Sequence, residues 1–166
     1  MNFIDNGRQR PPRALIVEDD MTWETIWSLV LKEINPHFEY TWATSAKEAG
    51  TYLDQSISTG EVFDVVISDI FVSGSKTGID LYERYREALT DRLIFTSGVD
   101  MNRLKKQVNA DGSKIAFLRK PFTKDQCIKT IRSVLSPQPS DLKPPAKPTI
   151  QIERPIKPIN SGLVWA

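Results

Sequence analysis

The segment DVVISDI, residues 64–70, decides the fold of this chain. Its residues Val65 to Ser68 form a nearly continuous apolar run, which is typical of a parallel strand covered by helices on both faces. We therefore expect this segment to be the central strand of an α/β sheet. The strand ends at Asp69, so a carboxylate follows the run directly.

Other apolar runs of the chain also end in polar residues that suit phosphoryl chemistry. These are the run 14–17 before Asp19 and Asp20, the run 93–95 before Thr96, and the run 115–118 before Lys120. The carboxyl ends of parallel strands share one edge of a sheet, where open α/β sheets place their ligand sites. The sequence therefore predicts one pocket that holds three carboxylates, a hydroxyl and an ammonium group.

Amphipathic segments alternate with the strands. Apolar residues recur at helical spacing in the segments 23–34, 46–57, 79–89, 101–108 and 124–135, and one more strand is expected over 38–43. Ser45 with Glu48, and Thr123 with Gln126, form capping-box patterns that predict two helix starts. Short connections favour right-handed crossovers. We expect an α/β fold, a flavodoxin-like doubly wound five-stranded parallel sheet of order 2-1-3-4-5 with five helices.

Composition divides the chain into three parts. Residues 1–12 are expected to form a flexible N-terminal arm, and residues 13–136 carry the predicted strands and helices. Residues 137–166 contain seven of the eleven prolines, which indicates a C-terminal tail rather than a second domain. A disordered tail is the simpler interpretation. The apolar residues in 149–165 suggest the hypothesis that this segment docks in extended form on the domain, a second copy or a partner.

Bulk properties exclude several classes of function. A formal net charge of +1 gives no bulk attraction for nucleic acid. Cys127 is the only cysteine, so the chain cannot form an internal disulfide or a cysteine metal cluster, which fits the cytoplasm. No apolar run approaches the roughly 18 residues that a membrane span needs. We expect a cytoplasmic protein that binds neither nucleic acid nor a membrane.

The carboxylates at the predicted sheet edge need a cation between them. Neighbouring strands lie about 4.8 Å apart, and two like charges about 4 Å apart repel by roughly 4 kcal/mol at an effective dielectric constant of about 20. Asp19, Asp20 and Asp69 therefore favour a hard divalent ion such as Mg²⁺. A carboxylate beside Mg²⁺ can attack phosphorus and form an aspartyl phosphate. Asp69 is the candidate nucleophile, and the long side chain of Lys120 can reach it.

Over residues 13–135 the sequence resembles the receiver domains of two-component response regulators. The motifs that carry the resemblance are Val17-Glu18-Asp19-Asp20, Ile67-Ser68-Asp69-Ile70, Phe95-Thr96-Ser97-Gly98 and Leu118-Arg119-Lys120-Pro121-Phe122. The resemblance implies that Asp69 accepts the phosphoryl group. It also implies that Asp19, Asp20 and Asp69, together with the backbone carbonyl of Phe71, bind Mg²⁺.

The resemblance further identifies residues that would respond to the phosphoryl group. Lys120 would pair with it and Thr96 would donate a hydrogen bond to it. Phe117 would be the switch aromatic that turns inward behind Thr96, so that a local event biases a two-state surface. The Lys120–Pro121 peptide bond resembles the cis bond of the family, since proline lowers the cis penalty to about 1 kcal/mol.

The implied function is that of a phosphoacceptor receiver and not of an enzyme. It would take a phosphoryl group from a histidine kinase or phosphotransfer protein and signal by protein contact, with a homodimer as a further assembly. The expected output surface carries Arg103, Lys105, Lys106 and Arg119. An ordinary solvated helix face explains those bases equally well. The alternative function is a receiver-like interaction module that works without phosphorylation, although intact Asp69 and Lys120 argue against it.

Two enzyme interpretations have weaker support. Gly74-Ser75-Lys76-Thr77 resembles a phosphate-binding loop only superficially, because no glycine directly precedes Lys76. A phosphatase of the haloacid dehalogenase type would need a second acid two residues after Asp69, where Phe71 stands.

Three positions depart from the pattern of the family. Ser73 stands where proline is usual, so the loop after Asp69 should be less rigid. Phe71 and Gly98 occupy positions that border the phosphoryl group in relatives. Bulky Phe71 would shield an acyl phosphate from water and Gly98 has no side chain to position one, so we expect slow autodephosphorylation.

Overall fold

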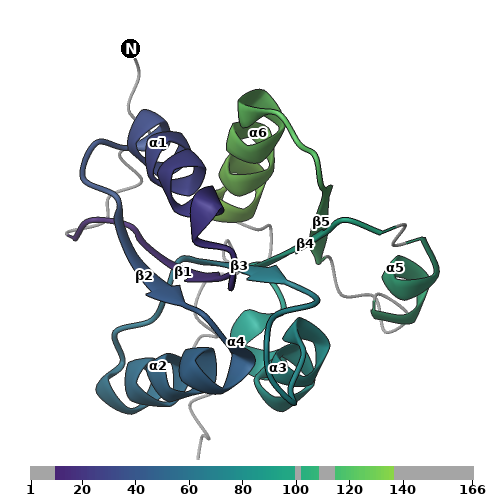
Figure 1. Cartoon of the computed structure of the whole chain (residues 1–166). Helices are drawn as coiled ribbons and strands as arrows, with labels where there is room; N and C mark the ends of the chain where they lie inside the picture. Colours follow the sequence, from purple (N-terminus) through teal and green to yellow (C-terminus); the bar gives the residue numbers. More distant parts are fainter. Residues whose placement is uncertain (1–9, 100–101, 109–114, 137–166) are drawn as a thin grey trace, which may run out of the picture. The chain divides into compact units, whose positions relative to one another are not determined.

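The computed structural model describes residues 10–99, 102–108 and 115–136. Its strands form one parallel sheet in the order β2-β1-β3-β4-β5, as the sequence predicts (Figure 1). The strands are β1 (Arg13–Val17), β2 (Glu39–Ala43), β3 (Val65–Asp69), β4 (Leu93–Ser97) and β5 (Ala116–Arg119). β3 is central and buried along its whole length, as expected for its apolar run.

Helices cover both faces of this sheet (Figure 1). One face carries α1 (Glu24–Ile34) and α6 (Lys124–Leu135), with the short 3-10 helix η1 (Met21–Trp23) directly before α1. The other face carries α2 (Ala46–Thr59), α3 (Gly78–Arg84) and α4 (Arg86–Leu89), while α5 (Asn102–Val108) lies beside the β5 edge. The fold is therefore the expected doubly wound α/β fold. Among the described residues, no helix combines the length and apolar character that crossing a membrane requires.

The third of the five expected helices is divided in two. The sequence predicts one helix over 79–89, but Tyr85 leaves the helical conformation, with φ −113° and ψ 26°, and separates α3 from α4. Its hydroxyl donates to Asp54 at 2.7 Å and to the Gly50 carbonyl at 3.1 Å, both on α2. The break thus lies where Tyr85 is tied to the neighbouring helix.

The capping boxes are confirmed in part. Thr123 and Gln126 cap α6 reciprocally, as predicted. Ser45 accepts a hydrogen bond from the Glu48 backbone N–H, but the Glu48 carboxylate accepts from the backbone and hydroxyl of Thr44 instead of Ser45. An unpredicted capping box of Thr77 and Asp80 begins α3.

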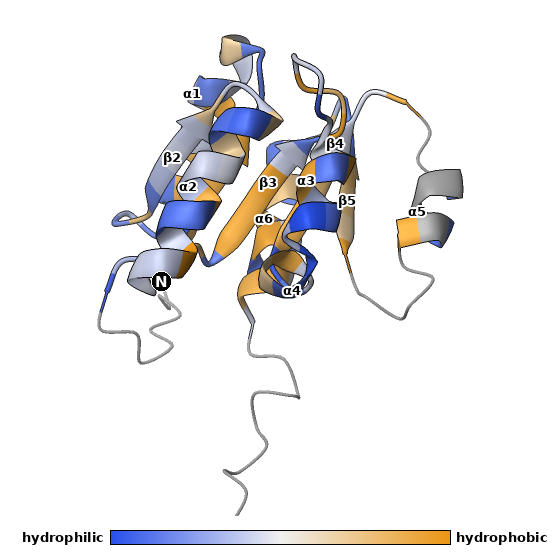
Figure 2. Ribbon diagram, turned by 90° about the horizontal axis from the view of Figure 1, so that it is seen from below, coloured by the Kyte–Doolittle hydropathy of each residue, from blue (hydrophilic) through white to orange (hydrophobic). Residues whose placement is uncertain are grey.

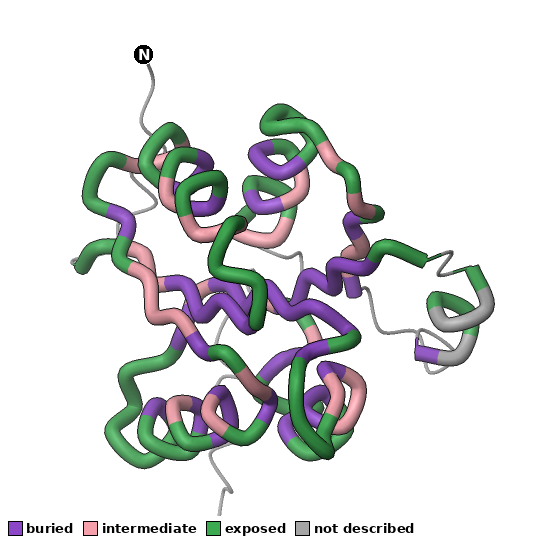
Figure 3. Tube along the Cα trace, in the orientation of Figure 1, coloured by how far each residue is buried: buried purple, intermediate pink, exposed green. Residues whose placement is uncertain are grey.

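Two apolar clusters hold the layers together, and alternate strand residues belong to each. Strand residues whose side chains point to one face of the sheet, such as Ile16, Ile67 and Ile94, pack under α1 and α6. Strand residues that point to the other face, such as Val66 and Phe95, pack against α2, α3 and α4. Figure 2 shows β3 as an apolar strand, and Figure 3 shows the middle of the sheet, where β1, β3 and β4 lie, as mostly buried.

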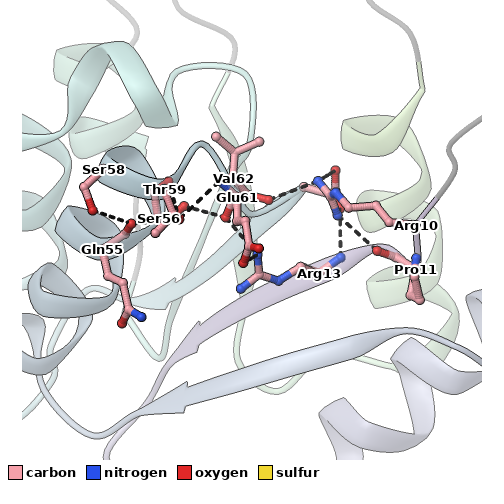
Figure 4. Close-up of polar contacts among 10 residues, drawn as sticks. Arg10, Pro11, Arg13, Gln55, Ser56, Ser58, Thr59, Glu61 and Val62 are labelled. Carbon is pink, nitrogen blue, oxygen red and sulfur yellow. Dashed lines mark hydrogen bonds and ion pairs between the residues drawn. The ribbon is translucent and has the colours of Figure 1, made fainter.

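The last residues of the expected N-terminal arm are anchored at the amino edge of the sheet (Figure 4). Arg10 donates to the Asp64 carboxylate at 2.9 Å and to the Val62 carbonyl at 3.1 Å. Arg13 donates to the Glu61 carbonyl at 2.8 Å. Residues 1–9 and the proline-rich segment 137–166 lie outside the described residues, so the three-part division and the docking of 149–165 stay predictions.

Candidate functional site

The strand register brings the predicted polar residues to one edge of the sheet. Val17 of β1 is paired with Ser68 of β3, so Glu18 leaves β1 beside Asp69. Asp69 is in turn paired with Thr96 of β4. Arg119 of β5 is paired with Ser97 of β4, and the Lys120 backbone N–H donates to the Ser97 carbonyl at 2.8 Å.

The pleat places the side chains of this edge on one face. Successive strand residues point to opposite faces of a sheet. Glu18, Asp69 and Lys120 each stand two residues after a residue that packs under α1 and α6, namely Ile16, Ile67 and Leu118, so they share that face. The Lys120 Nζ atom donates to Glu18 Oε2 at 2.5 Å and to Asp69 Oδ2 at 2.6 Å. One ammonium group therefore joins two carboxylates that come from different strands.

These three charged groups are poorly solvated. Glu18 is 2% exposed, Asp69 9%, and the Lys120 side chain 15%. Burial raises the pKa of Glu18 above its usual value, and the pairing with Lys120 only partly opposes this because Asp69 adds a second negative charge. Burial also acts to lower the pKa of Lys120, but its hydrogen bonds to Asp69 and Glu18 outweigh that effect and raise it. The lysine is consequently a fixed cation at neutral pH.

The sequence predicts that Asp19 and Asp20 bind the metal ion together, but the structure gives the two carboxylates different hydrogen-bond partners. Asp20 is exposed and caps η1, since it accepts from the Thr22 backbone N–H at 3.0 Å and from the Thr22 hydroxyl at 2.6 Å. These hydrogen bonds lower the pKa of Asp20. Asp19 accepts a hydrogen bond from the Ser73 hydroxyl, which belongs to the loop after β3.

The structure therefore brings Glu18, rather than Asp20, to Asp69 and Lys120. The sequence prediction overlooked Glu18 because it took the adjacent pair Asp19 and Asp20 as the acids of the first strand. The alternation of strand residues could have identified Glu18. It follows Ala14 and Ile16 at two-residue spacing on the face of β1 toward α1 and α6, and Asp69 follows Val65 and Ile67 on the same face of β3.

Thr96 and the backbone of Phe71 both lie next to Asp69. Thr96 is 1% exposed and is paired with Asp69 across the sheet. The Phe71 backbone N–H donates to Asp69 Oδ1 at 2.9 Å, and the residue is 61% exposed. The Lys120–Pro121 peptide bond is cis, which confirms that expectation.

Phe117 lies on the opposite face of the sheet from Asp69 and Lys120. It is half-buried and packs on Phe95, with ring centroids 5.6 Å apart. The Lys105 Nζ atom lies 5.5 Å from the centroid of the Phe117 ring. Phe117 is thus in contact with the helix α5 that carries part of the expected output surface.

The basic residues of that surface are described only in part. Lys105 and Lys106 on α5 and Arg119 at the end of β5 are exposed. The side chain of Arg103 lies outside the described residues.

The oxygen chemistry of the edge fits a hard divalent cation, although the groups are not assembled around one position. Within the described ranges, no cluster of three or more His, Cys, Asp or Glu side chains is arranged to hold a metal ion. Carboxylates of Glu18, Asp19 and Asp69 and the backbone carbonyl of Phe71 are the donor type that Mg²⁺ prefers. Ser73 donates to one oxygen of Asp19 and Lys120 to one oxygen of Asp69, and each carboxylate keeps further lone pairs for a cation.

Comparison with solved structures shows that this chain has the fold of response-regulator receiver domains. No protein-family model and no curated protein matches its sequence. The receiver domain of the Francisella response regulator 1452 is 25% identical, covers 75% of this chain and 96% of its own, and superposes with a TM-score of 0.60.

Other solved structures support the same fold. The Vibrio cholerae chemotaxis protein CheY4 is 23% identical, with 75% of this chain and 99% of its own covered and a TM-score of 0.57. A CheY-like receiver domain protein from Methanospirillum hungatei JF-1 is 20% identical, with 75% and 94% covered and a TM-score of 0.61. The predicted receiver resemblance is therefore confirmed at the level of the fold.

Proposed function

We propose that this chain is a phosphoacceptor receiver that takes a phosphoryl group onto Asp69. The observation that carries the proposal is the Asp69 carboxylate at the end of the central strand, 2.6 Å from the Lys120 ammonium. A carboxylate supplies the nucleophile, and a fixed cation beside it neutralises the charge of an incoming phosphoryl group.

The reaction needs a nucleophilic oxygen and a donor that leaves with its electron pair. An Asp69 oxygen attacks phosphorus and forms an oxygen–phosphorus bond, while the bond from phosphorus to the donor atom breaks. With a phosphohistidine donor the leaving atom is an imidazole nitrogen, which then carries the electron pair and takes up a proton. Lys120 pairs with the transferred phosphoryl oxygens, and the hydroxyl of Thr96 donates to one of them.

We also propose that the site uses Mg²⁺. Asp19, Asp69 and the Phe71 carbonyl would hold the ion, with Glu18 beside them, whereas Asp20 would first have to leave Thr22. When bound, the ion supplies positive charge to the phosphoryl oxygens. The structural support is the chemistry of the oxygen donors and the like charge of Glu18 and Asp69 on neighbouring strands.

The proposed partners are those that suit the chemistry of the site. The donor would be a histidine kinase or a phosphotransfer protein in the cytoplasm, and the output would be a protein contact through α5 and β5. Lys105, Lys106 and Arg119 are exposed there, and Lys105 contacts the ring of Phe117. A change in Phe117 would therefore alter the same surface that a target protein would bind.

Acetyl phosphate, a small phosphodonor, tests the proposal. We expect wild type to gain the mass of one phosphoryl group with Mg²⁺ and to lose this reaction when a chelator removes the metal. Asp69→Asn should gain none, because an amide is not a nucleophile toward phosphorus. The matched control is Asp91→Asn, since Asp91 is exposed and precedes β4 at the opposite edge of the sheet.

Equal labelling of wild type and Asp69→Asn would contradict the proposal. No labelling of wild type, in a sample that is folded and binds Mg²⁺, would favour the alternative of an interaction module that does not use phosphorylation.

A further inference from the structure

Trp23 lies over the lysine of the candidate site. The Lys120 Nζ atom is 4.9 Å from the centroid of the Trp23 ring, within the distance at which an ammonium group is attracted to an aromatic face. The same atom donates to Glu18 and Asp69. Lys120 is therefore held by two carboxylates and one aromatic ring.

The Trp23 ring is itself fixed by other aromatic residues. It packs on Phe122 with ring centroids 4.9 Å apart, and Phe122 packs on Trp27 at 5.2 Å. Trp27 is 1% exposed and belongs to the apolar cluster under α1 and α6. Asp20 fixes the backbone of η1 just before Trp23 by capping Thr22. The ring is consequently packed between Phe122 and the Lys120 ammonium at one side of the site.

The three contacts of Lys120 differ in what an incoming phosphoryl group does to them. The hydrogen bonds to Glu18 and Asp69 would be exchanged or weakened, because phosphoryl oxygens compete for the same N–H donors. The contact with Trp23 uses the face of the ring and does not consume an acceptor, so it can persist throughout.

We propose that Trp23 is a positioning residue that keeps the Lys120 ammonium aimed at Asp69 while its carboxylate partners change. This inference rests on the proposed function for its purpose, but the contact itself can be tested without phosphorylation. The rate of phosphorylation would then depend on the Trp23 ring, which contacts neither phosphorus nor the acceptor oxygen.

A double-mutant cycle of Trp23→Leu and Lys120→Met, measured by urea unfolding of the full chain, tests the contact. A cation–ring contact of about 1 kcal/mol corresponds to about a fivefold change in an equilibrium constant. Each substitution alone changes the unfolding equilibrium constant by some factor. We expect the factor measured for the double variant to be about fivefold smaller than the product of the two single-variant factors. Effects that simply multiply would overturn the proposal.

The conservative variant provides the second readout. Trp23→Phe keeps an aromatic face and should retain most of the acetyl phosphate reaction rate, whereas Trp23→Leu should lose about fivefold. Equal rates in Trp23→Leu and wild type would overturn the positioning role. If wild type accepts no phosphoryl group but the cycle shows coupling, the proposed function fails while the Trp23–Lys120 contact stands.

If Trp23→Leu does not fold, the fluorescence change caused by Lys120→Met replaces the cycle as the test of the contact between Trp23 and Lys120. We expect that change in the wild-type background and its loss in the Trp23→Phe background. A fluorescence change that is the same with and without Trp23 would overturn the proposal.

Discussion

At the residue scale, the site depends on which acid of β1 faces Asp69. Glu18 is buried and receives a hydrogen bond from Lys120, whereas Asp20 is exposed and caps η1. Charge and position in the sequence do not show which of the two belongs to the site, because both acids follow the same apolar run. Their hydrogen-bond partners do show it, since only Glu18 is bonded to Lys120.

Substitution of the two acids should therefore have unequal effects. We expect Glu18→Gln to slow phosphorylation by acetyl phosphate and Mg²⁺ roughly tenfold or more, as is common when a group that orients a metal site is changed. Asp20→Asn should stay close to wild type, since an asparagine can still cap η1. Rates are measured by intact mass spectrometry; a larger loss for Asp20→Asn than for Glu18→Gln would contradict the assignment.

The side chain of Phe71 bears on the lifetime of the phosphoryl group. Phe71 stands two residues after the proposed acceptor Asp69, its backbone N–H donates to Asp69 Oδ1, and the residue is 61% exposed. We expect Phe71→Asn to hydrolyse the acyl phosphate several-fold faster than wild type, because an apolar ring that excludes water is replaced by a polar group. Decay after removal of the donor is followed by mass; an unchanged decay rate would refute shielding by Phe71.

Cys127 provides a test of pH dependence away from the site. Its thiol is fully buried, and burial raises its pKa to about 11. In the unfolded chain the thiol ionises at lower pH, so the unfolded state loses its proton first and folding stability falls as the pH rises from about 9 to 11.

We expect the wild type to lose more stability than Cys127→Ala across this pH range, as measured by urea unfolding. Lysine and tyrosine titration is common to both proteins and cancels in the comparison. Parallel stability curves would show that the thiol is not protected by the fold.

At the scale of elements, the start of α3 is packed against the end of β3. The Gly78 backbone N–H donates to the Ile70 carbonyl at 3.0 Å. A Cβ atom at position 78 would lie 2.4 Å from the Asp69 carbonyl oxygen and 2.8 Å from the Ser68 hydroxyl oxygen. The glycine is therefore required by the close approach of the helix to the residue proposed to accept the phosphoryl group.

Gly78→Ala should destabilise the protein by about 1–3 kcal/mol, because the backbone carbonyl of Asp69 cannot move away without shifting β3. The control is Gly98→Ala, since nothing lies within 4 Å of a Cβ atom there. Urea unfolding of both variants measures the difference; equal stabilities would show that α3 does not constrain the end of β3.

Elements differ in how well the sequence predicted them. The central strand was readable because its apolar run is covered on both faces and ends in a charge. The division of the third helix was not, because it coincides with hydrogen bonds from Tyr85 to residues of α2, more than 30 positions earlier in the chain. Periodicity reports the face that a helix buries and carries no information on such distant contacts.

At the scale of the whole molecule, the parallel sheet explains why distant residues meet. Glu18, Asp69 and Lys120 belong to β1, β3 and β5 or follow them directly, and parallel strands bring these ends to one edge. The sequence predicted this edge and the pairing of Asp69 with Lys120. It could not predict the ring of Trp23 over Lys120, because that contact depends on how α1 and α6 pack together.

Trapping the acyl phosphate tests the central claim most directly. The full chain is incubated with acetyl phosphate and Mg²⁺ and then reduced with borohydride, which converts an aspartyl phosphate to homoserine. Peptide mass spectrometry then locates the modified residue. The account predicts homoserine at position 69 in wild type, and none in a sample incubated without donor. Homoserine at a different aspartate, with position 69 unchanged, would contradict it.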